Sequence, residues 1–190
     1  MDERCLKLVA GRFEVDLHPS RLSDVQAGVQ EQLNAQLFKF HDEFDGVVLS
    51  VGSYSTYAKE ATVHPYFPYC RLQVEAPLLI FSPQPGAKLV GSVTKIGMDY
   101  VGLLVLGVLN ASIPRDNIRK DFTHHSQAGE WRSKKQPGHV IRVGSRVVFR
   151  VVSCQKEETF FGISGSLMTK KTGCLDFLST AGKEQNGAGE

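Results

Sequence analysis

Apolar and polar positions in the first eighty residues follow two different periods. Residues 12–17 alternate strictly, which predicts a half-buried strand that ends before Pro19. A helical period follows and is predicted to run to about residues 39–41, with Ser23 and Gln26 as a capping box. Its apolar face consists of positions three or four residues apart: Leu22, Val25, Val29, Leu33 and Leu37. With further strands over residues 44–57 and 69–81, the front half is predicted to be a small sheet covered by one helix.

A loop of large apolar side chains interrupts this sheet. Residues 58–68 contain the run His64-Pro65-Tyr66-Phe67-Pro68, which is too rich in proline for a helix or a central strand. Exposed aromatic groups on such a loop favour contact with a partner over packing against the loop's own sheet. The sequence therefore predicts a docking loop in this segment.

The pattern changes after residues 82–86, Ser-Pro-Gln-Pro-Gly, which indicate a domain boundary. Beyond it, residues 119–138 are rich in Lys, Arg and His and are predicted to be an inserted mobile surface loop. The tail, residues 179–190, is predicted to be disordered. Five short apolar runs with glycine breaks predict a small Greek-key barrel: residues 88–96, 100–106, 108–113, 140–152 and 160–167.

The two halves differ in charge, although the net charge of the whole chain is only +2. Residues 1–83 carry seven Lys or Arg and eleven Asp or Glu, which is a net charge of −4. Residues 84–178 carry fourteen and seven, which is a net charge of +7. A basic barrel favours a polyanion as partner. On the basis of charge alone, a basic surface that is simply solvated is equally consistent with the sequence.

Cysteine usage and the absence of targeting segments indicate the compartment. Cys5, Cys70, Cys154 and Cys174 are scattered and form no Cys-x-x-Cys pair, which favours reduced thiols in the cytosol or nucleus. The first residues lack the apolar core of a secretory signal. No uncharged apolar run approaches the roughly 20 residues of a membrane span. A soluble intracellular protein without membrane association is therefore expected.

Motifs of common catalytic and metal sites do not occur in the sequence. The run Gly162-Ile163-Ser164-Gly165 lacks the strand-to-helix turn of a nucleophile elbow, and no Gly-rich loop is present to hold nucleotide phosphates. His124 and His125 would point apart on a strand, and no cysteine lies near them in sequence, which argues against a zinc site. The sequence predicts a protein that is not an enzyme and that has no metal or cofactor.

Three runs of the barrel half resemble a known family. Residues 89–96, 100–105 and 107–114 are similar to the OB domain of the stalk subunit of DNA-directed RNA polymerases. The sequence Asn-Ala-Ser-Ile-Pro at residues 110–114 resembles the polymerase I form in particular. Residues 162–168 resemble the closing strand that the family shares. The front half is similar to the family's tip domain. The resemblance covers roughly residues 5–178.

The resemblance implies a fold class and a function. It implies an α+β N-terminal tip (RNP-like) domain over residues 1–83, followed by an all-β OB-fold barrel over residues 84–178. It implies a non-catalytic stalk subunit of RNA polymerase I, acting in ribosomal RNA transcription in the nucleus and nucleolus. The implied partners are the core polymerase subunits, a smaller stalk subunit that completes a heterodimer, an initiation factor and nascent RNA. The residues expected to dock on the core polymerase are Gly46, Tyr57, His64, Pro65, Tyr66 and Phe67.

The expected ligand face of the barrel lies around its second and third strands. Tyr100 fits one stacking position of RNA-binding barrels of this type, but Asn110 stands where a histidine is common. Stacking contributes roughly 1–3 kcal/mol per base, so RNA contact is expected to be weak, non-specific and sensitive to salt. Lys134 and Lys135 would extend the surface unless they are simply solvated. The predicted RNA-binding residues are Lys95, Tyr100, Asn110, Arg115, Arg119, Lys120, Lys170 and Lys171.

Alternatives from other classes stay open at this point. The stalk subunits of polymerases II and III share these domains. A free-standing RNA-binding OB protein, such as an RNA-processing or exosome-type accessory factor, would bind RNA tightly through Tyr100 and independently of Tyr66 and Phe67. An enzyme would need an active site that the sequence does not display.

Overall fold

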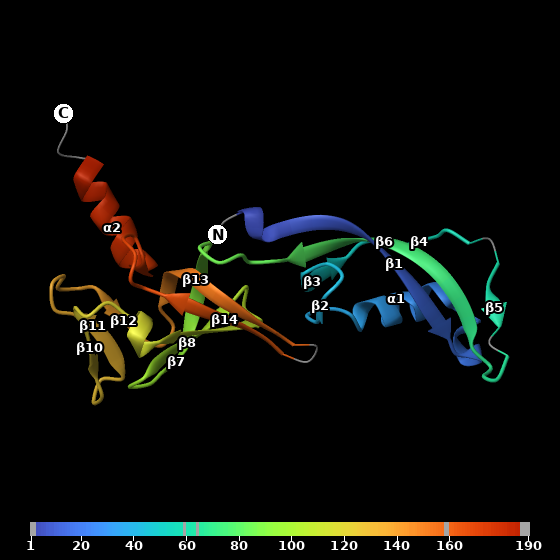
Figure 1. The fold of residues 1–190 in the computed structure, drawn as a ribbon, viewed down its shortest axis with the longest axis horizontal. Helices are drawn as coiled ribbons and strands as arrows, with labels where there is room; N and C mark the ends of the chain where they lie inside the picture. Colours follow the sequence, from blue (N-terminus) through green and yellow to red (C-terminus); the bar gives the residue numbers. More distant parts are fainter. Residues whose placement is uncertain (1–2, 59, 64, 158–159, 187–190) are drawn as a thin grey trace. The chain divides into compact units, whose positions relative to one another are not determined.

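The computed structural model describes residues 3–58, 60–63, 65–157 and 160–186 and consists of two compact units (Figure 1). The front unit comprises Leu6–Ser82. The barrel unit comprises Met1–Cys5 together with Pro83–Glu190. The division falls within residues 82–86, the segment in which two prolines and a glycine interrupt the pattern of strands.

The front unit is built on two long antiparallel strands. β1 (Leu6–Leu17) pairs with β6 (Cys70–Phe81) along all twelve residues of each strand. β3 (Gly46–Val51) pairs with the other side of β6, and β2 (Phe40–His41) extends the sheet beyond β3. The short strands β4 (Ser55–Thr56) and β5 (Thr62–Val63) also pair with β6. The unit is therefore mostly sheet.

One helix, α1 (Val25–Asn34), accompanies this sheet (Figure 1). Val29 and Leu33 on α1 are buried against Val15 and Leu17 of β1 and Val74 and Ala76 of β6. The prediction of a helix reaching residues 39–41 is wrong, because the chain leaves the helix at Ala35 and Phe38 adopts a left-handed conformation with φ 61°. The predicted capping residue is also wrong, since the Asp24 carboxylate accepts the hydrogen bond from Ala27 N–H at 3.0 Å.

Five strands of the barrel unit close on themselves. Their order is β14 (Phe160–Ser166), β9 (Leu109–Pro114), β8 (Tyr100–Val105), β7 (Lys88–Ile96) and β13 (Arg146–Glu157), and β13 returns to β14. β14 runs parallel to β9, while the other pairs are antiparallel. Close packing at the closure requires Gly165, because a Cβ there would lie 2.5 Å from Cδ2 of the buried Phe149 ring. The predicted OB-type barrel is confirmed.

The insertion between β9 and β13 is a folded sheet, so the prediction of a mobile loop over residues 119–138 is wrong. β10 (Phe122–His125), β11 (Glu130–Ser133) and β12 (Val140–Ile141) pair antiparallel in that order. Phe122, Trp131 and His139 are buried, so the insertion is a packed part of the barrel unit. Asp121 anchors the hairpin, because its carboxylate accepts from Ser133 Oγ at 2.9 Å and its carbonyl accepts from Lys134 N–H at 2.8 Å.

The chain after the barrel is helical through Asn186, which differs from the predicted disorder of residues 179–190. The strand β15 (Gly173–Cys174) pairs with β13, and α2 (Leu175–Asn186) follows it directly. Phe177 on α2 stacks on the His139 ring at 4.4 Å between centroids, which attaches the first turn to the insertion. Residues 187–190 lie outside the described residues. No helix in the described part of the chain combines the length and the apolar character that crossing a bilayer requires.

Candidate nucleic-acid interface

A hollow of about 560 Å³ lies between the barrel and the insertion sheet, and we call it the basic groove. Residues 115–120, which follow β9, form one side, and the hairpin of β10 and β11 forms the other. The 115–120 segment is fixed on β14, since Asn117 Nδ2 donates to the Gly165 carbonyl at 3.2 Å and Leu167 N–H donates to the Asn117 carbonyl at 2.8 Å. The charged side chains that line the groove are Arg115, Asp116, Arg119, Lys120 and Lys134, and the His124 ring lines it as well.

Arg119 is the best-fixed cation of the basic groove. Its guanidinium lies 5.2 Å from the centroid of the Phe122 ring, and Nε lies 3.5 Å from an Asp121 carboxylate oxygen. The side chain is only 22% exposed, and its buried Nε makes no hydrogen bond within the described residues. Arg119 also lines an adjoining hollow of about 390 Å³ together with Lys120, Lys134 and Lys135. A guanidinium held in this way keeps donors available for an anion.

Apolar and aromatic groups share the basic groove with these cations. Trp131 donates its indole N–H to the Gly97 carbonyl at 3.2 Å, which fixes the indole between the hairpin and the turn after β7. The His124 ring lies 5.4 Å from the Trp131 ring at an angle of 52°. Met98 and Met168 also line the groove, and they are 60% and 52% exposed. The groove therefore combines positive charge with surfaces on which a planar ring can pack.

A second candidate surface lies on the strands of the barrel, and we call it the strand face: Lys95, Tyr100 and Asn110. Lys95 Nζ lies 5.7 Å from the centroid of the Tyr100 ring. Tyr100 raises the pKa of Lys95, first through a side-chain hydrogen bond and second through the charge of Tyr100. Tyr100 is 37% exposed at the start of β8, and Asn110 is exposed on β9. The strand face thus offers one aromatic ring, one cation and one amide.

The structure separates the predicted RNA-binding residues into groups. Arg115, Arg119 and Lys120 line the basic groove, whereas Lys95, Tyr100 and Asn110 form the strand face. Lys170 and Lys171 are exposed in the turn after β14 and line neither hollow described above.

Sequence reasoning missed His124 and Trp131 as groove residues because it treated the insertion as a loop, and it also missed Met98 and Met168, which lie outside the insertion. The signal that could have found the hairpin is the pair of short runs Phe122–His125 and Glu130–Ser133 around a turn that ends at Gly129.

Most of the predicted docking residues are exposed in the front unit. Tyr66 is 87% and Phe67 59% exposed, Pro65 is exposed beside them, and Tyr57 lies with its ring 5.5 Å from the Arg12 guanidinium carbon. Gly46 differs from the prediction because it is buried at the start of β3, where a Cβ would collide with the side chain of Ile80. Gly46 thus has a packing role and presents no surface to a partner. His64 lies outside the described residues.

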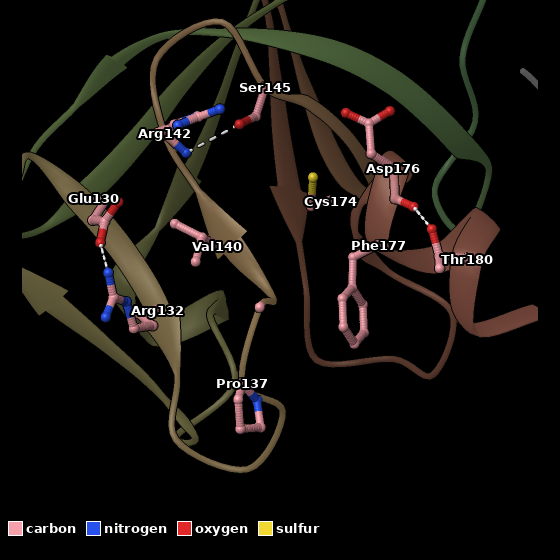
Figure 2. Close-up of a pocket in the computed structure, with 11 residues that line it drawn as sticks. Glu130, Arg132, Pro137, Val140, Arg142, Ser145, Cys174, Asp176, Phe177 and Thr180 are labelled. Carbon is pink, nitrogen blue, oxygen red and sulfur yellow. Dashed lines mark hydrogen bonds and ion pairs between the residues drawn. The ribbon is translucent and has the colours of Figure 1, made fainter.

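Another hollow, of about 770 Å³, lies between the insertion sheet and α2. Figure 2 shows Val140 of β12 and Phe177 of α2 on facing sides of it, with the Glu130–Arg132 ion pair of 2.6 Å at its edge. Its charged side chains have both signs, since Asp176 and Arg142 also line it. Such a mixture indicates no particular ligand. Among the described residues, no group of three His, Cys, Asp or Glu side chains is placed to hold a metal ion.

His139 lies buried behind the insertion sheet and connects it to β15. Its Nε2 accepts a hydrogen bond from Cys174 N–H at 2.9 Å, so Nδ1 carries the proton and lies 3.3 Å from the Gln136 amide oxygen. Its ring packs edge-on against Phe122 at 5.0 Å. Burial lowers the pKa of His139 to about 4; the positive charge of Arg119 also lowers it, and Asp121 acts in the opposite direction. His139 is therefore neutral at physiological pH.

The closed five-stranded barrel defines the chain as an OB-fold protein, here with a separate sheet unit before the barrel and a folded, basic insertion within it. Residues 83–168 match the model of a family described as the RPA43 OB domain in RNA Pol I. The barrel unit is thus similar to the OB domain of RPA43 subunits of RNA polymerase I.

Individual relatives agree with the family match. The chain is 27% identical to the probable DNA-directed RNA polymerase I subunit RPA43 of Dictyostelium discoideum over 92% of this chain and 49% of the relative. It is 34% identical to the RPA43 subunit of Danio rerio over 60% of this chain and 29% of the relative. It is 29% identical to rpa43 of Schizosaccharomyces pombe over 80% of this chain and 92% of the relative. The chain thus spans about half the length of the Dictyostelium relative and a smaller part of the Danio one.

Proposed function

We propose that this chain is a non-catalytic stalk subunit of RNA polymerase I that acts in ribosomal RNA transcription in the nucleolus. The observation that carries the proposal is the match of residues 83–168 to the RPA43 OB domain, together with relatives that are all named as polymerase I subunits. These names favour polymerase I over polymerases II and III and over a free-standing RNA-processing factor.

An α+β tip domain over residues 1–83 is proposed to dock on the core polymerase, and the front unit, Leu6–Ser82, makes up most of it. Its sheet carries one helix, α1, and the segment after β5 presents Tyr66 and Phe67 to solvent. Two large exposed aromatic side chains next to each other are typical of surfaces that contact a partner. The smaller stalk subunit and an initiation factor are further proposed partners, as the resemblance to the stalk family implies.

The OB domain over residues 84–178, which is the main part of the barrel unit, is proposed to contact nascent RNA. Fourteen basic and seven acidic residues give this part of the chain a net charge of +7, which favours a polyanion. Attraction to phosphates is independent of sequence and falls with salt, so the contact would be weak and non-specific. Such a contact suits a transcript that must slide past the protein.

Affinity purification of the tagged chain tests the assignment to polymerase I. We expect the two largest subunits of polymerase I to copurify, and the double substitution Tyr66→Ala and Phe67→Ala to reduce their yield severalfold. Arg142→Ala is the matched control, because Arg142 is exposed in the barrel unit and lies outside both proposed contact surfaces. Copurification of polymerase II or III subunits instead, or of no polymerase, would contradict the proposal.

A further inference from the structure

We propose that the basic groove holds one nucleotide of a single-stranded RNA, with a phosphate on Arg119 and the base against His124 and the exposed methionines. This inference rests on the proposed function, because nascent RNA is the polyanion that the barrel unit would meet there. It moves the RNA contact from the strand face to the junction between the barrel and the insertion sheet.

Arg119 is suited to bind a phosphate because its position is fixed before the ligand arrives. The Phe122 ring below the guanidinium and the Asp121 carboxylate beside it restrict the side chain. A planar guanidinium binds two phosphate oxygens through parallel N–H groups, and a side chain that is already ordered loses little entropy in doing so. Asp121 also accepts from Ser133 Oγ at 2.9 Å, which fixes its carboxylate beside Arg119.

Further cations lie around Arg119 in the two adjoining hollows. Lys120 and Lys134 line both the basic groove and the adjoining hollow, where Lys135 joins them. Arg115 lies within the basic groove itself. Flexible lysines around one fixed arginine are typical of a surface that contacts a nucleic-acid backbone, because each lysine can follow a phosphate without demanding one geometry.

The base is assigned to the apolar part of the groove. The His124 ring packs on Trp131, whose indole N–H donates to the Gly97 carbonyl. The positions of both rings are therefore fixed. Met98 and Met168, more than half exposed, provide polarisable surface beside it. Sulfur and aromatic groups both pack well on a planar ring, which is why an unpaired base fits here.

The shape of the groove favours a single strand over a duplex. Its volume of about 560 Å³ falls within the roughly 300–1,000 Å³ of sites that enclose a small ligand. In A-form RNA the bases are stacked inside and present their edges only in a shallow minor groove. No base of a duplex can therefore pack on the His124 ring. A flexible single strand can turn one base outward into the groove.

Fluorescence anisotropy with the full-length chain tests this site. The probes are a labelled single-stranded 12-mer of uridine and the same strand annealed to a 12-mer of adenosine. We expect the single strand to bind at least about 5-fold more tightly at low salt, because only unpaired bases can stack on the protein.

Two substitutions separate the phosphate contact from the base contact. Arg119→Ala should weaken binding of the single strand about tenfold at low salt and reduce the slope of log affinity against log salt by about 0.7, as expected for one lost phosphate contact. His124→Ala should weaken it about 5-fold without changing that slope, because it removes stacking and not charge. Arg142→Ala is the control for a lost surface charge, and Lys120→Gln repeats the slope test at an exposed position where misfolding is not a concern.

Equal affinity for single strand and duplex, or unchanged affinity in both Arg119→Ala and His124→Ala, would overturn the proposal. A salt slope that falls equally in Arg142→Ala would do the same, since any surface charge would then serve. Copurification of the wild-type chain with polymerase I is a separate measurement. If it fails while the groove variants behave as expected, the proposed function is wrong and the RNA site stands; the reverse result removes the site and leaves the function.

Discussion

The basic groove and the strand face are two surfaces of one barrel unit, and they differ in how their side chains are held. In the groove, Arg119 is fixed by a ring and a carboxylate, and Trp131 is fixed by a hydrogen bond. On the strand face, Lys95 interacts with Tyr100, the aromatic group that a base would need. A base that stacked on the same face of Tyr100 would compete with that lysine. The comparison teaches that the insertion, rather than the strands of the barrel alone, can make the better-ordered site.

Trp131→Ala is expected to have the largest effect in this comparison. Trp131 is 3% exposed, and its removal leaves a cavity and an unpaired Gly97 carbonyl. Truncation of a buried aromatic residue costs about 3–5 kcal/mol of folding free energy. Urea unfolding monitored by circular dichroism, a signal that does not depend on the tryptophan, will measure this loss. Tyr100→Ala, the matched change on the strand face, should cost far less. Equal losses of stability would mean that the insertion does not pack as the structure has it.

Acidification is expected to act on the groove through His139, with an effect of intermediate size. The pKa of His139 is lowered from 6.5 to about 4 in the folded chain, mainly by burial. The unfolded state therefore binds more protons between pH 6.5 and 4, so the stability that a neutral His139 provides is complete above pH 6.5 and is lost as the pH falls towards 4. The loss amounts to about 3 kcal/mol at most. Protonation of Nε2 would also break the hydrogen bond that it accepts from Cys174 N–H, because two donors would then face each other.

Urea unfolding of wild-type protein and of His139→Gln at pH 7 and pH 4.5 measures this contribution. We expect the variant to be less stable at pH 7 and to lose less stability between the two values, because glutamine does not titrate in this range. His125→Gln, a change at an exposed histidine of the same insertion, is the control. An identical pH dependence in His139→Gln and wild type would show that His139 is not the responsible group.

Tyr100→Ala is expected to have the smallest effect. Tyr100 is 37% exposed, so the fold should lose no more than about 1 kcal/mol, as is usual for changes near the surface. Affinity for single-stranded uridine 12-mer should fall by less than about 3-fold, because the base is assigned to the groove and not to this ring. A larger loss than that of His124→Ala would reverse the comparison and make the strand face the main RNA surface.

The barrel strands could be predicted from the sequence because each carries its own local signal. Alternation bounded by glycine turns located β7, β8, β9 and β14 to within a residue or two, since one face of each strand is buried in the barrel core. The helix α1 was located but its end was not. Its end depends on the left-handed Phe38, whose N–H donates to the Val48 carbonyl from another strand, and no local pattern encodes that bond.

The groove could be predicted only in part, for a related reason. Arg115, Arg119 and Lys120 are close in sequence, so a cationic segment beside the third barrel strand is visible without a structure. The opposite wall depends on four-residue strands whose buried members, Phe122 and Trp131, become a core only when the hairpin packs against its surroundings. Because the segment is rich in Lys and His, the burial of these two aromatic residues was not predicted from the sequence.

The parallel pairing of β14 with β9 has a consequence for how the chain is made. Gly162, Ile163 and Ser164 pair with Asn110, Ala111 and Ser112, so the barrel cannot close until the ribosome has released a segment some fifty residues beyond its partner strand. The hairpin of β10 and β11, in contrast, can form as soon as it emerges, because its two strands are separated by a short turn. Closure of distant segments is slow compared with local hairpins. During synthesis, the edge of β9 that later pairs with β14 therefore stays unpaired and open to aggregation until β14 has emerged.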